Sequence, residues 1–213
     1  MNLKKEYINR LPVNLHWDPF TFVDKNIHYV NDDYKDILLE DLIKIDLREL
    51  YPNILVGLFN EGLICDRWKN DIERVKYFLK NRSDLKLLNV YEYQECRIHC
   101  NSLYGKIKSP LIVEYLHHVY TDLINEYKDD IIHIDVDMII CKRDIDVSSI
   151  PSIIYEKSEV EYFFIKGVKR YIIFSNGQLK MCWNGRDREK NDIEQLVKNE
   201  IRNRRLDKLG ICV

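Results

Sequence analysis

The chain has 213 residues, of which 46% are hydrophobic and 32% charged, and its 35 acidic and 33 basic side chains leave a formal net charge of −2. This composition excludes a disordered tail and a coiled coil. The length suits one compact domain, or a core with small appendages, and allows a sizeable core. The apolar runs are shorter than the roughly 18 residues that a membrane span needs, and no signal-like segment follows residues 1–10. We expect no membrane partner and a cytoplasmic location, in the host cytoplasm if the source is viral.

The six cysteines are scattered and contain no C-x-x-C pair. This spacing favours reduced packing residues over a zinc site or a disulfide framework. Cys96 and Cys100 are four residues apart, so that a helix would place both thiols on one face. Packing is the favoured interpretation for them too, with a metal site as the alternative.

The first elements predicted along the chain are a strand and several helices. Apolar and polar residues alternate over 42–46, which predicts a strand, and Pro52 suits the first turn of a helix that follows. Apolar residues recur at helical spacing over 70–80 and 85–106, and the polar stretch 81–84 is predicted to separate these two helices into a hairpin. A third long helix is predicted over 111–127.

Strands are predicted to dominate the remainder of the chain. The runs 131–134 and 138–140 favour a β-hairpin, with Asp135 and Asp137 at its tip. Two further strands are predicted over 161–173 and 178–183, joined at Ser175-Asn176-Gly177, and an amphipathic helix is predicted over 191–209. This order of elements predicts an α+β fold with an antiparallel sheet.

Three aspartates, Asp46, Asp135 and Asp137, lie at predicted strand ends. An unpaired carboxylate taken out of water costs several kcal/mol, so a cluster of them calls for cations. If the three converge, they can hold two magnesium ions about 4 Å apart, the arrangement used for in-line phosphoryl transfer. A lone Asp-x-Asp is more typical of turn residues in solvent. If only the aspartates are considered, solvated turn residues are therefore the favoured interpretation.

The segments around these aspartates resemble motifs of the family B DNA polymerases. Residues 46–54, D-L-R-E-L-Y-P-N-I, resemble motif A, D-x-x-S-L-Y-P-S-I, and residues 97–105 resemble motif B, K-x-x-x-N-S-x-Y-G, with Arg97 in place of lysine. Residues 133–138, H-I-D-V-D-M, match motif C, Y-x-D-T-D-S, at both aspartates, and residues 168–171, V-K-R-Y, are similar to the family's K-K-R-Y segment. Four motifs in the family's own order are far more specific than any one of them.

The resemblance covers roughly residues 42–188 and implies a polymerase palm with an antiparallel sheet. It implies a palm part with motif A over 1–60, a short helical fingers hairpin over 61–106, a palm part with motif C and the K-x-Y segment over 107–183, and a reduced thumb or C-terminal helix over 184–213. No exonuclease domain fits in the 45 residues that precede Asp46, so proofreading is expected to be absent.

The resemblance also implies the metal ligands. Asp46 and Asp137 are expected to bridge two Mg²⁺ ions, for which Mn²⁺ can substitute. Asp135 is expected to be a nearby carboxylate that can bind one of them, and the Leu47 carbonyl is a further expected ligand. These three aspartates are expected to be catalytic, together with Arg97.

Other motif residues are expected to bind the incoming nucleotide. Tyr51 is expected to lie under the sugar, where its ring would exclude a ribose 2′-hydroxyl. Arg97 and Asn101 are one helical turn apart and share a face, from which Arg97 can stabilise the leaving pyrophosphate. Arg74 and Tyr104 are further candidates, with a solvated basic face and a core tyrosine as their respective alternatives.

Primer-template DNA is the expected macromolecular partner. Lys169 and Tyr171 are predicted to alternate on one strand and face the duplex, and the other expected DNA contacts are Gly105, Arg170, Arg202 and Arg205. Residues 164–208 hold twelve basic and six acidic side chains, a net of +6, so the other residues total −8. Such asymmetry is typical of a surface that contacts nucleic acid, although a solvated helix end is the alternative for the last helix.

The expected function is therefore template-directed DNA synthesis, in which dNTPs are added to a primer 3′-hydroxyl without proofreading. The alternative is a degenerate or partner-dependent palm that acts as a DNA-binding or replication-complex subunit, with a processivity or exonuclease chain as a candidate partner. A reverse transcriptase or primase ranks lower, because neither ordinarily carries N-S-x-Y-G between its acidic motifs. The chain departs from the motifs at Glu49 and Asn53, which replace serines, and at His133 and Met138.

Overall fold

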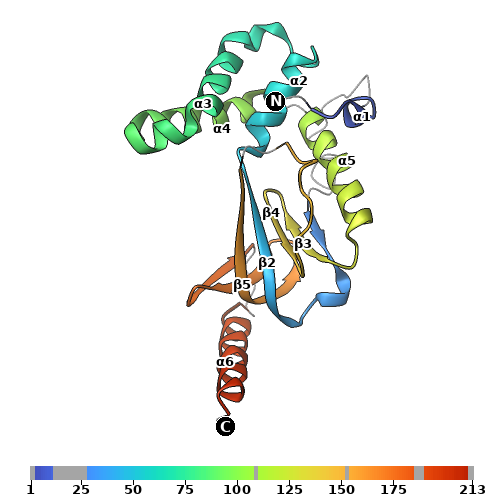
Figure 1. The fold of residues 1–213 in the computed structure, drawn as a ribbon, viewed down its shortest axis with the longest axis vertical. Coiled ribbons are helices and arrows are strands. Elements are labelled where there is room, and N and C mark those ends of the chain that lie inside the picture. The colour runs from blue at the N-terminus through green and yellow to red at the C-terminus, as the bar shows by residue number, and fades with distance from the viewer. Residues whose placement is uncertain (1–2, 12–27, 108–109, 152–153, 185–189, 211–213) are drawn as a thin grey trace. The chain divides into compact units, whose positions relative to one another are not determined.

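The computed structural model describes residues 3–11, 28–107, 110–151, 154–184 and 190–210, and the chain divides into two compact units. Unit 1 comprises residues 1–27, 47–128 and 146–156, and its described elements are mainly helices. Unit 2 comprises residues 28–46, 129–145 and 157–213, and holds most of the sheet and the last helix (Figure 1). The two units thus interleave along the sequence.

Unit 1 is built around four longer helices. Figure 1 shows two of them, α3 and α4, side by side as a hairpin. Buried apolar side chains of α2, α3 and α5 at helical spacing, among them Ile54, Leu58, Ile72, Val75 and Tyr115, form the core. The helices are α1 (Lys5–Ile8), α2 (Leu50–Asn60), α3 (Lys69–Leu88), α4 (Val90–Ile107) and α5 (Pro110–Glu126).

The helical hairpin is confirmed, but the predicted break at 81–84 is wrong. Helix α3 continues through these residues because their polar groups find partners. Asn81 Nδ2 donates to the Tyr77 carbonyl, and Arg82 is buried against Glu49. The break comes at Asn89, whose Oδ1 accepts from the Glu92 backbone N–H and so caps α4.

Unit 2 contains a seven-stranded sheet in the order β1-β3-β4-β2-β5-β6-β7. The pairings β1–β3, β3–β4, β2–β4, β5–β6 and β6–β7 are antiparallel. The strands are β1 (His28–Val30), β2 (Leu38–Arg48), β3 (Ile131–Asp135), β4 (Met138–Cys141), β5 (Ile154–Gly167), β6 (Arg170–Ser175) and β7 (Gln178–Trp183), and the first residues of β5 and the last of β2 belong to unit 1.

Strand alternation gives the sheet two apolar faces. One face gathers a cluster that includes Met138, Ile140, Phe163, Ile165 and Tyr171. The neighbouring residues Tyr162 and Ile172 lie on the other face with Leu38 and the apolar side of α6 (Lys190–Lys208). Ion pairs reinforce this packing, since Arg204 and Lys208 of α6 both contact the Glu40 carboxylate, at 2.8 and 2.7 Å.

The structure corrects one strand prediction and confirms a turn. Residues 161–173 do not form one strand, because the chain reverses between β5 and β6 at Val168-Lys169, with Lys169 in the left-handed region at φ 53°. At the β6–β7 turn, Asn176 and Gly177 have φ of 51° and 72°, as a two-residue hairpin turn requires. The α+β class is confirmed, and no helix in the described parts of the chain is long and apolar enough to cross a membrane.

Candidate functional site

The register of the central strands aligns two of the motif aspartates. Asp46 on β2 and Asp135 on β3 both pair with Met138 on β4, one from each side. Residues directly opposite each other in a sheet share a face, so Asp46, Met138 and Asp135 form one row on one face of unit 2. Asp137, in the β3–β4 turn, immediately precedes Met138 and is exposed.

The β3–β4 turn has an unusual backbone. Val136, between the two aspartates, has φ 55°, a left-handed conformation that is strained for a β-branched side chain. Strain of this kind costs about 1–3 kcal/mol and persists only where surrounding contacts hold it. The chain therefore maintains an unfavourable turn at the motif C-like aspartates.

The Asp135 carboxylate is held by two other strands of the sheet. Its Oδ1 lies 2.9 Å from Nδ1 of His28 on β1, and its Oδ2 accepts a hydrogen bond of 2.9 Å from the Tyr171 hydroxyl on β6. Burial alone would raise the pKa of Asp135, but the close contact with His28 and the hydrogen bond from Tyr171 outweigh it, so the pKa lies below its ordinary value. Asp135 is therefore ionised at neutral pH.

Asp46 has a cation as its neighbour on the same strand. Lys44 is two residues away, so both side chains lie on one face of β2, and its Nζ lies 2.6 Å from Asp46 Oδ2. Within the described residues, no group of three or more His, Cys, Asp or Glu side chains is placed to hold a metal ion. The sheet thus aligns Asp46 with Asp135, without gathering three carboxylates into one cage.

The remainder of the motif A-like segment lies at the start of α2. Leu47 is buried, and Tyr51 is half-buried in the first turn of the helix. Glu49, which precedes α2, has φ 56°, and its backbone carbonyl accepts from the side chain of Asn53 at 2.7 Å. The carboxylate of Glu49 pairs with Arg82, so its charge is compensated inside unit 1.

Helix α4 presents two of the motif B-like residues to solvent. Arg97 and Asn101 are both exposed and one turn apart. The side chain of Tyr104 and the surroundings of Gly105 lie outside what the structure describes. Cys96 and Cys100 are buried on the same helix, and burial raises the pKa of Cys100 to about 12, which fits a packing thiol.

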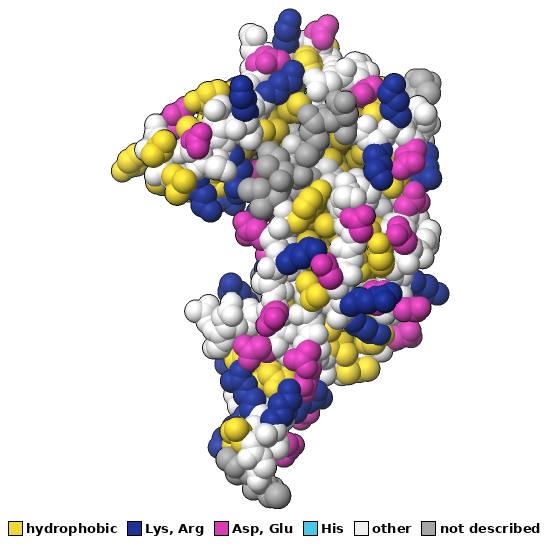
Figure 2. Space-filling model, viewed as in Figure 1, with side chains coloured by type: hydrophobic (Ala, Val, Ile, Leu, Met, Phe, Trp, Pro, Cys, Tyr) yellow, Lys and Arg dark blue, Asp and Glu magenta, His cyan; other side chains and the backbone are white. Residues whose placement is uncertain are grey.

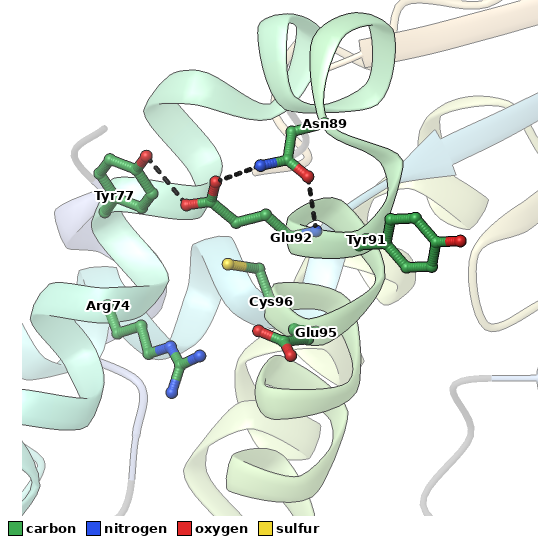
Figure 3. A pocket seen from close by; sticks show the side chains of 7 residues that line it. All are labelled: Arg74, Tyr77, Asn89, Tyr91, Glu92, Glu95 and Cys96. Carbon is green, nitrogen blue, oxygen red and sulfur yellow. Dashed lines mark hydrogen bonds between the residues drawn. The ribbon is translucent and has the colours of Figure 1, made fainter.

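Arg74 lines an open pocket of about 430 Å³ between α3 and α4. Figure 3 shows the other lining side chains, in which Glu92 accepts hydrogen bonds from Tyr77 and Asn89. Two carboxylates, Glu92 and Glu95, share the pocket with the single guanidinium of Arg74. This charge balance is unfavourable for a triphosphate.

The V-K-R-Y segment, residues 168–171, forms the β5–β6 turn and the start of β6, which changes the expected arrangement of its side chains. The prediction that Lys169 and Tyr171 alternate on one strand is wrong, because Lys169 is a turn residue and Tyr171 lies on β6. Arg170 is half-buried. The ring of Tyr171 is buried, and its hydroxyl points to Asp135.

The two candidate DNA contacts on α6 differ in their surroundings. Arg205 Nη2 lies 2.5 Å from Glu161, and its guanidinium lies 4.5 Å from the centre of the Phe174 ring. Arg202 is exposed. Figure 2 shows that basic and acidic side chains intermingle over this end of unit 2.

Two histidines lie beside Asp135: His133, which the motif comparison gave only as a departure from motif C, and His28, which it did not find. Nδ1 of His133 donates to the Tyr29 carbonyl at 2.7 Å, and its ring lies against Phe163 and Tyr171. Its Nε2 is buried and has no hydrogen-bond partner among the described residues. His28 belongs to the three-residue strand β1, which has no hydrophobic period that could have revealed it.

Comparison with known proteins found that this chain is similar to solved structures of a DNA polymerase, among them the following two. No family model and no curated protein sequence matches it. A structure of Phi29 DNA polymerase in an orthorhombic crystal form matches with 12% identity and a TM-score of 0.49, over 85% of this chain and 55% of that one. Phi29 DNA polymerase complexed with single-stranded DNA matches with 13% identity and a TM-score of 0.46, over 84% and 54%. The chain spans about half the length of the proteins to which it is similar.

Proposed function

We propose that this chain is a template-directed DNA polymerase related to family B, which adds dNTPs to a primer 3′-hydroxyl by phosphoryl transfer. One observation carries the proposal. The motif A-like Asp46 and the motif C-like Asp135 stand in one row of an antiparallel sheet, next to the turn that holds Asp137. In this proposal the sheet of unit 2 is the palm and the α3–α4 hairpin of unit 1 is the fingers element.

The proposed cofactor is a pair of Mg²⁺ ions, for which Mn²⁺ can substitute. Mg²⁺ prefers oxygen ligands and is commonly bound through one or two carboxylates together with substrate phosphates, so Asp46 and Asp137 with the Leu47 carbonyl are a sufficient protein set. The bound ions would lower the pKa of the attacking hydroxyl and stabilise the leaving oxygens. A cation at Asp46 has to displace Lys44, whose ammonium contacts that carboxylate.

Asp135 has a different role in this proposal from that of the other two aspartates. Both of its oxygens already have partners in His28 and Tyr171, so a metal ion could bind Asp135 only by displacing one of them. Its ionised carboxylate contributes negative charge beside the proposed cations.

The proposed nucleotide contacts lie in unit 1. Arg97 would stabilise charge on the triphosphate, a role that suits a permanent cation better than a proton donor because arginine does not deprotonate in proteins. Asn101, on the same face of α4, would bind alongside it, and Tyr51 would exclude a 2′-hydroxyl. Arg97 is the preferred triphosphate contact over Arg74, because Arg74 shares its pocket with two carboxylates.

The proposed DNA contacts lie in unit 2. Lys169 and Arg170 at the β5–β6 turn, with Arg202 on α6, would bind primer-template phosphates without reading sequence. Arg205 contributes less in this proposal because it already pairs with Glu161.

A second candidate function is a DNA-binding or replication-complex subunit without synthesis of its own. It is favoured by the partners that Asp46 and Asp135 already have, and by the lack of a three-carboxylate cage in the described part of the chain. A chain that acts only with a processivity or exonuclease partner belongs to the same class.

Templated incorporation distinguishes these functions. The purified chain is given a DNA primer-template with each dNTP in turn, in Mg²⁺ or Mn²⁺ at low salt, on four templates that differ only at the first unpaired base. The polymerase proposal expects incorporation of the complementary nucleotide on each template. Duplex binding without incorporation would replace it with the subunit function.

A further inference from the structure

Strand β1 brings a histidine to the candidate catalytic carboxylates from outside all four motifs. The β1–β3 register sets His28 opposite Asp135, Tyr29 opposite Ile134 and Val30 opposite His133. His28 and Asp135 therefore share a face of the sheet, while the Tyr29 side chain points to the other face.

The position of β1 is fixed by a side chain as well as by the strand pairing. His133 is fully buried, and its Nδ1 donates to the carbonyl of Tyr29, the neighbour of His28. The strand that places His28 beside Asp135 is therefore held both by its pairing with β3 and by a hydrogen bond to its central residue, Tyr29.

Asp135 is held from two sides by residues that lie far apart in the sheet order. Strands β4, β2 and β5 lie between β3 and β6, so the Tyr171 hydroxyl reaches Asp135 across the sheet face and not from a neighbouring strand. His28 holds the other oxygen at 2.9 Å, and the side chains of His28 and Asp135 are only 21% and 14% exposed. A carboxylate with both oxygens held in this way cannot rotate freely.

The contacts of Asp135 with His28 and Tyr171 lie next to the strained β3–β4 turn. Asp135 is the last residue of β3, and the strained Val136 follows it directly, before Asp137. Contacts that hold Asp135 help to keep this turn in its strained conformation, so their loss should let the backbone relax and shift Asp137.

We propose that His28 is a positioning residue for phosphoryl transfer: it fixes the Asp135 carboxylate together with Tyr171, and so holds Asp137 in the geometry that the reaction needs. The inference rests on the proposed polymerase function. His28 acts through Asp135 and does not touch the substrate. Partners that hold catalytic carboxylates in other enzymes typically change activity by about 10–100-fold when they are removed.

The test compares two replacements of the same histidine. His28→Phe keeps a ring of similar size without a donor, whereas His28→Asn keeps a donor near the position of Nδ1. Tyr29→Phe is the matched control, because it changes the same strand on its other face. Each variant is first checked for cooperative urea unfolding, and His28→Leu replaces His28→Phe if the latter does not fold.

Two measurements are made on each variant. Single-turnover incorporation gives the maximal rate and the KM for the complementary dNTP, and hydrogen exchange reports the backbone amides of Val136, Asp137 and Met138. For His28→Phe we expect a maximal rate lower by about tenfold or more, a nearly unchanged KM and faster exchange at the turn. His28→Asn should recover most of the rate and the protection.

The outcomes separate this inference from the function on which it rests. Wild-type rates and protection in a folded His28→Phe variant would overturn the positioning role alone, and so would equal losses in the Phe and Asn variants. No incorporation by the wild type would overturn the polymerase proposal and the positioning role with it. A loss in Tyr29→Phe as large as that in His28→Phe would overturn the positioning role alone.

Discussion

Arg82 of α3 donates from Nε to Oε1 of Glu49 across 2.8 Å, and the two side chains are only 9% and 13% exposed. The Arg82 guanidinium also lies 5.9 Å from the centre of the Tyr93 ring on α4. Within unit 1, this pair links the residue before α2 to the helical hairpin. Asn53 donates to the carbonyl of the same Glu49, so both departures from the motif A serines are accommodated locally.

Breaking this buried pair should destabilise the chain far more than removing it altogether. Arg82→Leu leaves the Glu49 carboxylate buried and unpaired, and the free energy of unfolding should fall by about 3 kcal/mol. The double variant Arg82→Leu/Glu49→Leu should recover most of that loss. Urea unfolding of the two single variants and the double variant gives the coupling energy, and a value near zero would contradict a buried ion pair.

Tyr51 is predicted to set the preference for deoxynucleotides. If its ring lies under the incoming sugar, Tyr51→Ala should lower the preference for dNTP over rNTP by about tenfold or more, because the 2′-hydroxyl then fits. Tyr51→Phe retains the ring and serves as the control. The measurement is the ratio of kcat/KM for the two nucleotides, and an unchanged ratio in Tyr51→Ala would remove this role.

The two arginines on α6 should respond differently to the same substitution. Arg202→Gln should weaken binding to duplex DNA and reduce the salt slope of log affinity by about one, with unfolding unchanged. Arg205→Gln removes the contacts with Glu161 and Phe174, so it should lower the free energy of unfolding by up to about 1 kcal/mol. Anisotropy titrations of labelled duplex DNA over a range of salt concentrations measure this slope. An unaltered slope in Arg202→Gln would exclude a contact between Arg202 and a DNA phosphate.

His133 should make the folded chain sensitive to acid. Burial lowers its pKa from 6.5 to about 4, so the native state keeps it neutral while the unfolded chain takes up a proton below pH 6.5. Stability should therefore fall as the pH drops from 6.5 to about 4, by about 3 kcal/mol in total, and His133 adds no further loss below that. Urea unfolding in EDTA measures this loss. In His133→Phe, the free energy of unfolding should change less between pH 6.5 and about 4. Parallel curves for the two proteins would contradict a buried neutral histidine.

The elements with a clear hydrophobic period were predictable from the sequence. Helix α5, the β3–β4 hairpin and the Asn176-Gly177 turn follow their local patterns closely. The β5–β6 turn could not be predicted from the sequence, because neither Val168 nor Lys169 favours a left-handed backbone. The continuity of α3 depended on a partner distant in sequence, since Glu49 is what makes a buried Arg82 tolerable.

The candidate site was predictable only in part, because some of its contacts join residues that are distant in sequence. Motif spacing located Asp46, Asp135 and Asp137, and the strand register then aligned the first two. His28 was missed because its role arises from pairing between strands more than 100 residues apart in sequence, as the register of His28 with Asp135 shows. A three-residue strand has too few positions to show a period.

Asp137 is the residue on which the proposed phosphoryl transfer to a DNA primer depends, so its replacement is the decisive experiment. Single-nucleotide incorporation is measured for the wild type, for Asp137→Asn and for Asp129→Asn, the last an exposed aspartate outside the motifs. We expect Asp137→Asn to lose incorporation by a factor of about a thousand or more while it still binds duplex, and Asp129→Asn to retain the wild-type rate. Equal incorporation by all three proteins would contradict the assignment of Asp137 and the site built around it.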